Sequence, residues 1–195
     1  PTEGQVKGEQ ADCLLKRWST AEELHDLFLS ALVFGWCQAT GEDDCYVQLE
    51  HHGRVGFKGS NPQPTVGWMV HHFPQMVRMK RDEKSFKVIE TVKRLRANIP
   101  NEGVGFGLLR YMSENESIRE KMSKIAIPRL LFFYRSGLDD TFRPNVSFPI
   151  MKHSAYVPKP LGKRHDPILG LFVGKNREGI GWRFDNTLNA VPKEK

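Results

Sequence analysis

The spacing of apolar residues predicts two amphipathic helices in the first half of the chain. The first covers residues 20–38, and Thr20 followed by Glu23 gives the sequence pattern of a capping box at its start. Its apolar face consists of residues at helical spacing: Leu24, Leu27, Phe28, Ala31 and Leu32. The second covers 83–97, with basic residues opposite an apolar face made of Phe86, Ile89, Val92 and Leu95. We expect both helices to face a core.

Runs of β-forming residues predict strands around these helices. They are CYVQLE (45–50), TVGWMVHHFPQMVRM (65–79), RLLFFY (129–134), ILGLFVG (168–174) and GIGWRF (179–184). Pro74 is expected to end the pairing of the second run, and a Pro-rich, polar segment at 143–167 lies between the later strands. Helices interspersed with strands indicate an α/β fold, a two-layer sandwich in which helices cover a mixed sheet.

The overall composition fits one soluble domain, or one lobe of a larger one. The chain has 195 residues, a mass of 22.4 kDa and 39% hydrophobic residues, so it is long enough to bury a core. It contains no run of about 18 apolar residues, and its first ten residues lack an apolar signal segment. Three cysteines without C-x-x-C spacing favour reduced, structural thiols. We therefore expect a cytoplasmic protein that does not bind a membrane.

Two binding classes are disfavoured by the sequence. The net charge of +6 suggests acidic partners, but the basic residues are interspersed with Asp and Glu, which favours a solvated surface over a nucleic-acid interface. The pattern G-x-G-x-G at 103–107 follows a predicted helix and Pro100, whereas a dinucleotide-binding loop follows a strand and opens a helix. We expect no nucleic acid, and we interpret these glycines as allowing close approach of two backbone segments.

Five short segments together resemble one known family. They are HDLFLSAL (25–32), EHHGRV (50–55), TVGWMVHHFP (65–74), IPNEGVGFG (99–107) and FFYRSG (132–137). In order and spacing they resemble motifs from the C-terminal half of nonribosomal peptide synthetase epimerization domains, approximately D-x-L-L-x-A, E-G-H-G-R-E, R-T-V-G-W-F-T-x-x-Y-P, P-x-x-G-x-G-Y-G and F-N-Y-L-G. Related condensation domains share this scaffold, but VGW and PNEGVGFG are more similar to the epimerization branch.

The resemblance implies one lobe of a chloramphenicol acetyltransferase-like fold, with residues 1–195 as a single C-terminal lobe. In this superfamily the main catalytic histidine belongs to an H-H-x-x-x-D-G motif in the N-terminal lobe. Neither His-His pair of this chain matches, because the Asp-Gly positions hold Gly-Phe after the first pair and Met-Val after the second. We therefore expect the catalytic histidine on a missing N-terminal lobe.

By resemblance, Glu50 is the glutamate of the E-G-H-G-R-E motif and the candidate catalytic residue. Epimerization removes an α-proton and returns it on the opposite face, which suits two acid/base groups that flank the carbon. His52 and Arg54 match the motif's histidine and arginine, and both are expected to organise the strand end. Trp68 is expected to border the tunnel between lobes, although a tryptophan is more often a core residue. The alternative for Glu50 is an ordinary surface carboxylate, and no metal is expected.

Three positions depart from the family pattern. His51 replaces a glycine, Val55 replaces a glutamate, and Phe133 replaces an asparagine that would offer a hydrogen bond to the thioester oxygen. Tyr111 and Tyr134 are expected to serve packing. Three interpretations therefore stay open. The chain is part of a domain that epimerizes carrier-bound aminoacyl or peptidyl thioesters from L to D, and it is inactive alone; or it is a condensation lobe that forms peptide bonds; or it is a non-catalytic carrier-docking module.

The resemblance also implies a peptidyl carrier protein as partner, which presents the substrate on phosphopantetheine, so no cofactor is expected on this chain. Carriers are commonly acidic near this attachment point. The basic face of the helix at 83–97 would steer such a partner, or is an ordinary solvated surface. Its residues are Lys84, Lys87, Lys93, Arg94 and Arg96.

Overall fold

The computed structural model describes residues 2–56, 59, 61–80, 84–135, 169–176 and 179–186. Within these ranges the chain forms a mixed six-stranded sheet in the order β1-β6-β5-β4-β2-β3. The pairs β4–β2 and β5–β4 are parallel, and the other neighbours are antiparallel. The strands are β1 (Thr2–Lys7), β2 (Asp44–His51), β3 (His71–Arg78), β4 (Leu130–Arg135), β5 (Leu169–Asn176) and β6 (Gly179–Asn186).

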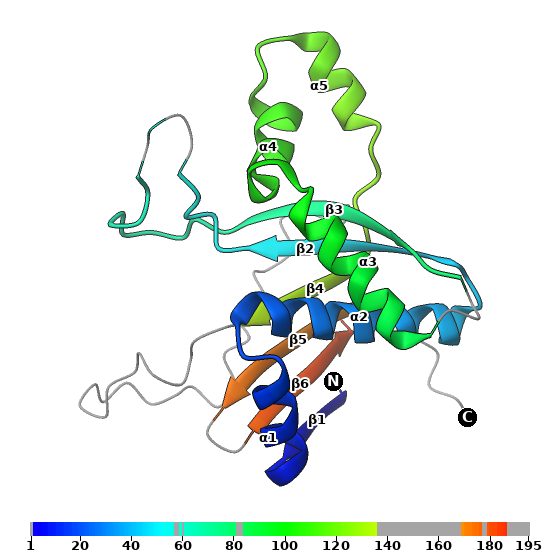
Figure 1. The fold of residues 1–195 in the computed structure, drawn as a ribbon. Coiled ribbons are helices and arrows are strands. Elements are labelled where there is room, and N and C mark those ends of the chain that lie inside the picture. The colour runs from blue at the N-terminus through cyan, green and yellow to red at the C-terminus, as the bar shows by residue number, and fades with distance from the viewer. Residues whose placement is uncertain are drawn as a thin grey trace.

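Three helices pack on one face of this sheet (Figure 1). They are α1 (Gly8–Arg17), α2 (Ala21–Thr40) and α3 (Ser85–Ala97). Beyond α3 the chain forms an arch that returns to β4 and contains short elements: the 3₁₀ turn η1 (Pro100–Gly103), α4 (Val104–Gly107), the π-helical turn η2 (Leu108–Met112) and α5 (Glu116–Ser123). The expected α/β sandwich with a mixed sheet and a helical layer is confirmed.

Helix α2 begins as the sequence predicts. The Thr20 hydroxyl accepts a hydrogen bond from the Glu23 backbone N–H, and the Glu23 carboxylate accepts one from the Thr20 N–H, so the capping box is complete. The helix ends at Gly41, whose φ of 76° lies in the left-handed region that glycine adopts without strain. Leu24 and Leu32 are buried as expected, but Ala31 is exposed, so its place on the apolar face was predicted wrongly.

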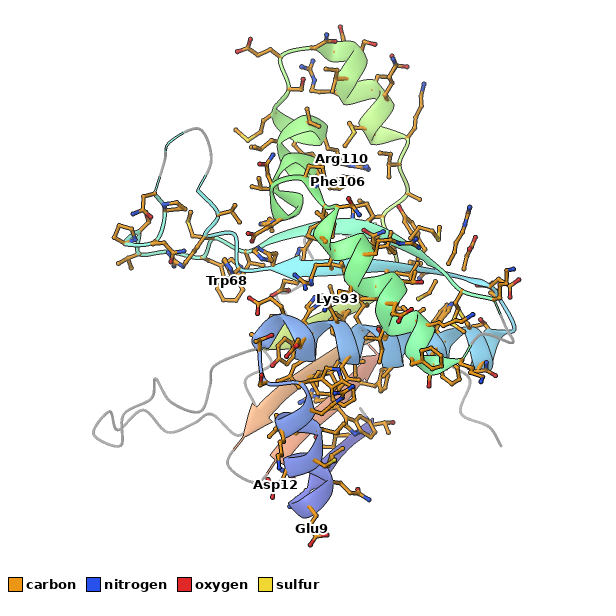
Figure 2. All side chains as sticks on the ribbon, in the orientation of Figure 1. Glu9, Asp12, Trp68, Lys93, Phe106 and Arg110 are labelled. Carbon is orange, nitrogen blue, oxygen red and sulfur yellow. The ribbon has the colours of Figure 1, made fainter. Side chains whose placement is uncertain are left out.

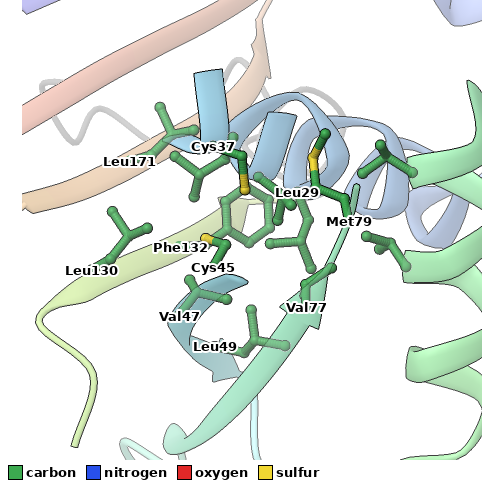
Figure 3. Packing of buried hydrophobic residues seen from close by; sticks show 14 of the residues in the cluster. Leu29, Cys37, Cys45, Val47, Leu49, Val77, Met79, Leu130, Phe132 and Leu171 are labelled. Atoms are coloured by element: carbon green, nitrogen blue, oxygen red, sulfur yellow. The ribbon is translucent and has the colours of Figure 1, made fainter. Parts of the chain in front are cut away.

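The core lies between the helical layer and one face of the sheet (Figure 3). Alternation along β2 buries Cys45, Val47 and Leu49 against the helices, and Phe132 from β4 and Cys37 from α2 meet them there. Burial raises the pKa of the Cys45 thiol to about 12 and also raises that of Cys37. Both thiols therefore stay protonated, in agreement with a structural role.

Helix α3 packs on the core through Val92 and Leu95 as expected, but the rest of its buried face differs from the prediction. Val88 and Val92 are fully buried, whereas Phe86 is 54% exposed and Ile89 is only partly covered. The face that packs on the sheet consists of Val88, Val92 and Leu95, which are four and three residues apart and therefore lie on one side of the helix.

Strand β3 also departs from the expectation. It begins at His71 rather than near 65, and it continues through Pro74, which is paired in register with Gln48. A proline is tolerated here because β3 is the last strand of the sheet, so its missing N–H interrupts no second ladder.

Several elements were not predicted at all. The strand β1 and the arch from α4 to α5 carry little periodic apolar sequence, whereas α1 has apolar residues at helical spacing, Ala11, Leu14 and Leu15, that were overlooked. The Pro-rich segment at 143–167 lies outside the described residues. The remaining predicted strands are confirmed as β2, β4, β5 and β6. Within the described ranges, no helix combines the length and apolar character that crossing a bilayer requires.

Helices α2 and α3 are joined by an ion pair at the edge of the core. The Arg96 guanidinium donates two hydrogen bonds to the Asp26 carboxylate, at 2.7 and 2.9 Å. Burial alone would raise the pKa of Asp26, but the nearby His25 imidazole and the hydrogen bonds from Arg96 lower it overall. The carboxylate is therefore held ionised where only 3% of its side chain is exposed.

We expect the loss of stability to depend on which partner of the Arg96–Asp26 ion pair is replaced. Arg96→Met strands a buried negative charge and should lower the free energy of unfolding by about 3 kcal/mol. Asp26→Asn should cost less, about 1 kcal/mol, because the freed Arg96 side chain is 35% exposed and can reach water. Urea denaturation at about pH 7 measures both, with Arg78→Met in the exposed Arg78–Asp44 pair as the matched control. Equal losses for Arg96→Met and the control would contradict this account.

Candidate functional site

The two His-His pairs of the sequence meet at one end of the β2–β3 hairpin. The antiparallel register places His51 opposite His71 and Glu50 opposite His72. Because successive side chains alternate between faces, His51 and His71 point toward the helical side of the sheet and Glu50 and His72 point to the opposite side. The segment EHHGRV therefore divides between two environments.

Glu50 forms a close pair with an imidazole on the side of the sheet that faces away from α2 and α3. Its Oε2 atom lies 2.8 Å from Nε2 of His72. The Glu50 side chain is 14% exposed and that of His72 is 42% exposed. Sequence reasoning singled out Glu50 but assigned nothing to His72, because the two residues are 22 positions apart and become neighbours only through strand pairing.

On the helical side, Glu102 joins the other two paired histidines. Its carboxylate lies 2.8 Å from Nε2 of His51, and its backbone carbonyl lies 2.9 Å from Nε2 of His71. Glu102 and the preceding Asn101 have φ values of 52° and 47°, which non-glycine residues rarely adopt. This strained conformation in η1 places the carboxylate and the backbone carbonyl oxygen of Glu102 over the end of the hairpin.

The environment of His51 keeps its imidazole neutral. Burial, together with the neighbouring imidazoles of His52, His71 and His25, lowers the pKa of His51 to about 4. The Glu102 carboxylate would favour the charged form, but it is 56% exposed, so water weakens that attraction. The Glu102 carboxylate therefore lies beside a neutral ring.

His51, His52 and Glu102 place potential metal-ligand atoms within 4.8 Å of one another. Their hydrogen bonds oppose such use. Nδ1 of His52 accepts the Arg54 N–H at 3.0 Å, and Nδ1 of His51 accepts the Gly53 N–H at 3.4 Å. Each ring proton then sits on Nε2 and leaves no lone pair there for a metal. We assign these residues no metal.

Arg54 organises the long loop between β2 and β3. Its guanidinium donates hydrogen bonds to the carbonyl oxygens of Pro62, Thr65 and Gly67, at 3.1, 2.6 and 3.1 Å. The loop is also closed at its base, where Gly53 has a φ of 68° and a Cβ added to it would lie 1.6 Å from a backbone oxygen of Met69. These contacts fix the shape of a loop that protrudes from the sheet (Figure 1).

Trp68 lies on this loop and is 85% exposed (Figure 2). The alternative that it is a core residue is therefore wrong. Phe133 lies on β4, which pairs in parallel with β2. Alternation from the Leu49–Phe132 pair places Phe133 on the same side of the sheet as Glu50.

A hollow of about 320 Å³ lies between β3 and the arch. Its lining includes Gln48, His72 and Pro74 from the sheet and Phe106 and Tyr111 from the arch. Tyr111 is 65% exposed, so its expected role in packing is wrong, whereas Tyr134 contacts Phe28 in the core as expected.

Of the three glycines in the 103–107 pattern, Gly103 has a clear structural requirement. A Cβ at this position would lie 2.2 Å from the ring of Phe73, so the turn packs directly on an aromatic side chain. We expected two backbone segments to approach each other here, but the close contact is between the Gly103 backbone and the Phe73 ring. A Cβ added at Gly105 or Gly107 would meet open space, and the pattern begins after helix α3, unlike a phosphate-binding loop.

Comparison with known sequences identifies the class of the chain. The sequence profile of the Condensation domain family matches residues 11–127. The chain therefore belongs to the condensation-domain family, and the resemblance to nonribosomal peptide synthetase domains is confirmed. It is 33% identical to a linear gramicidin synthase of Brevibacillus parabrevis over 66% of this chain, and 28% identical to bacitracin synthase 3 of Bacillus licheniformis over 70%. It spans only 3% and 2% of those proteins.

Solved structures show the same fold. The epimerization domain from the third module of tyrocidine synthetase B superposes with a TM-score of 0.70 at 19% identity and covers 94% of this chain. The first condensation domain of the CDA synthetase superposes with a TM-score of 0.54 at 16% identity, covering 95% of the chain. The chain spans 41% and 39% of these two structures.

The Arg54 contacts predict the behaviour of the loop. Arg54→Lys keeps the charge but cannot reach three carbonyl oxygens from a planar fork, so amide hydrogen exchange across residues 61–70 should accelerate roughly tenfold. Exchange measured by mass spectrometry tests this, with Arg78→Lys as a control on the neighbouring strand. Unchanged exchange in the loop of the Arg54→Lys protein would show that these hydrogen bonds do not hold it.

The buried imidazole of His51 predicts a pH dependence of stability. Above the ordinary pKa of 6.5 the ring is neutral in both folded and unfolded chains, whereas below it the unfolded chain binds a proton that the folded chain refuses down to about 4. The free energy of unfolding should therefore fall by roughly 3 kcal/mol as the pH drops through this window. Denaturation at several pH values should show a shallower fall for His51→Gln. An identical slope in that variant would contradict the assignment.

Proposed function

We propose that this chain is the C-terminal half of an epimerization-type domain that inverts the α-carbon of carrier-bound aminoacyl or peptidyl thioesters from L to D. The observation that carries the proposal is the setting of Glu50. Its carboxylate is 14% exposed, lies on the side of the sheet away from the helices and is hydrogen-bonded to an imidazole. The alternative of a fully solvated surface carboxylate does not fit this setting.

The chemistry of inversion explains why such a carboxylate would be needed. One group removes the α-proton and a second returns a proton from the opposite face, so acid/base groups must stand on both sides of the carbon. Glu50 would supply one of them. By resemblance, the second is the histidine of an H-H-x-x-x-D-G motif on an N-terminal lobe. Neither His-His pair of this chain matches that motif, because Gly-Phe and Met-Val stand where it requires Asp-Gly.

A peptidyl carrier protein would bring the substrate on its phosphopantetheine arm. Helix α3 offers a basic surface for that encounter, since Lys84, Lys87, Lys93 and Arg94 are exposed (Figure 2 labels Lys93). Arg96 belongs to the same sequence pattern but is occupied by Asp26. Four of the five expected residues are therefore placed to attract an acidic carrier.

A condensation lobe is the second candidate. The matching family profile is named for condensation, and the curated relatives are peptide synthases. The fold is common to both activities. The two differ in their product, because epimerization changes chirality within one substrate whereas condensation joins two.

The role of Glu50 is tested in a protein that contains both lobes. With a carrier-loaded L-aminoacyl thioester, Glu50→Gln should slow α-proton exchange with solvent by at least about 100-fold and leave carrier binding intact. Glu102→Gln is the matched control, because this glutamate also pairs with a histidine at the same strand end but lies on the helical side. It should leave exchange unchanged.

The other outcomes separate the alternatives. Peptide-bond formation with retained L chirality would favour the condensation lobe. Full activity of Glu50→Gln would favour a non-catalytic docking module, in agreement with the departures at His51, Val55 and Phe133. The 195-residue chain by itself should show no exchange, and exchange by this chain alone would refute the half-site proposal.

A further inference from the structure

The contact between Glu50 and His72 has a defined direction. When Glu50 is ionised its Oε2 only accepts, so Nε2 of His72 donates the hydrogen bond across 2.8 Å. The second ring nitrogen, Nδ1, does not take part in that bond. His72 also lines the 320 Å³ hollow beside β3, and its side chain is three times as exposed as that of Glu50, at 42% against 14%. The imidazole therefore connects a shielded carboxylate to the surface.

An epimerase with two acid/base groups has a step that a simple hydrolase lacks. After one inversion, the group that took the α-proton is protonated and the group that gave a proton is not. Both groups must exchange protons with solvent before the next L substrate can react. A carboxylate with little exposure needs a route for that exchange, and its partner imidazole provides one.

We propose that His72 is a positioning residue for Glu50 and relays protons between this carboxylate and solvent. The inference rests on the proposed epimerization function. After Glu50 has taken the α-proton, exchange with water resets the His72 ring from the Nε2–H to the Nδ1–H tautomer, with one proton gained at Nδ1 and one lost from Nε2. The Glu50 carboxylic acid then transfers its proton to Nε2 while the Nδ1 proton leaves to water. The ring changes tautomer, Glu50 regains its negative charge, and one proton has moved to solvent. The same steps in reverse protonate Glu50 again, so the relay can support inversion in either direction.

The neighbouring histidines are committed elsewhere. Nε2 of His51 lies 2.8 Å from the Glu102 carboxylate, His71 donates to the Glu102 carbonyl oxygen, and Nδ1 of His52 accepts the Arg54 N–H. His72 occupies a position that the family motif R-T-V-G-W-F-T-x-x-Y-P leaves unspecified. The relay is therefore a feature of this chain, beyond the residues that the resemblance implies.

The test compares single and multiple turnovers in the protein that contains both lobes. His72→Gln retains an N–H donor toward Glu50 but cannot carry a proton. It should leave the first-turnover inversion within about twofold and slow steady-state epimerization by about tenfold or more. In His72→Ala, added imidazole should restore much of the steady-state rate. His51→Gln, on the other side of the sheet, is the control and should change neither rate.

The outcomes distinguish the relay from the function on which it rests. If Glu50→Gln retains first-turnover inversion, the proposed function fails. If Glu50→Gln loses it but His72→Gln keeps the full steady-state rate, or if imidazole does not rescue His72→Ala, the relay fails. A loss of the first turnover in His72→Gln would also overturn it.

A measurement on the unmodified chain guards against misfolded variants. Nitrogen-15 NMR of the histidine rings should show His72 as the Nε2–H tautomer at neutral pH, held by the hydrogen bond to Glu50. Glu50→Gln should abolish that preference. An Nδ1–H tautomer of His72 in the unmodified chain, or a tautomer that does not respond to Glu50→Gln, would overturn the relay.

Discussion

The antiparallel register of β2 and β3 is the constraint on which the candidate site depends. It sets Glu50 opposite His72 and His51 opposite His71. Burial of apolar side chains on the helical side fixes this register, because a slip by one residue would turn every side chain to the other face. Val47 on β2 and Val77 on β3 are fully buried and would be expelled by such a slip. Packing that has no chemical role thus determines which carboxylate meets which imidazole.

The two sides of the sheet therefore perform different tasks. On the helical side, Glu102 contacts His51 through its carboxylate and His71 through its backbone carbonyl, and the strained η1 turn delivers that glutamate. On the other side lies the Glu50–His72 pair, to which the proposed proton chemistry is assigned. Arg54 is adjacent to both sides, because it holds the loop that begins directly after this strand end.

The sequence predicted those helices and strands whose residue pattern lies within a single element. The capping box and apolar period of α2, and the apolar runs of β2 and β4, are signals within one element. On α3, Val92 and Leu95 were placed correctly, whereas Phe86 was not, because it fits the helical period but lies in the first turn, where it remains exposed. The exposed strand β1 and the arch gave no signal, since few of their side chains enter the core.

For the site, the motif resemblance located Glu50 and Arg54, but no local pattern could reveal what they contact. The partner of Glu50 lies across a hairpin whose loop is 19 residues long, from position 52 to 70. A shorter turn would have specified the pairing from sequence, whereas here the register follows from burial. The repeated His-His pair would have given the wrong register, because antiparallel alignment of the two pairs sets His72 opposite His51, one residue away from the observed Glu50–His72 pairing.

Pro74 has a consequence for how other chains can approach this sheet. An outermost strand with a full row of free N–H and C=O groups invites a foreign strand to add to it, which is a common beginning of aggregation. The ring of Pro74 removes one donor in the middle of β3, and the hollow beneath the arch occupies the space next to it. Continuation of the sheet beyond β3 is therefore discouraged, and another chain would meet this edge through side chains rather than through shared β-ladder hydrogen bonds.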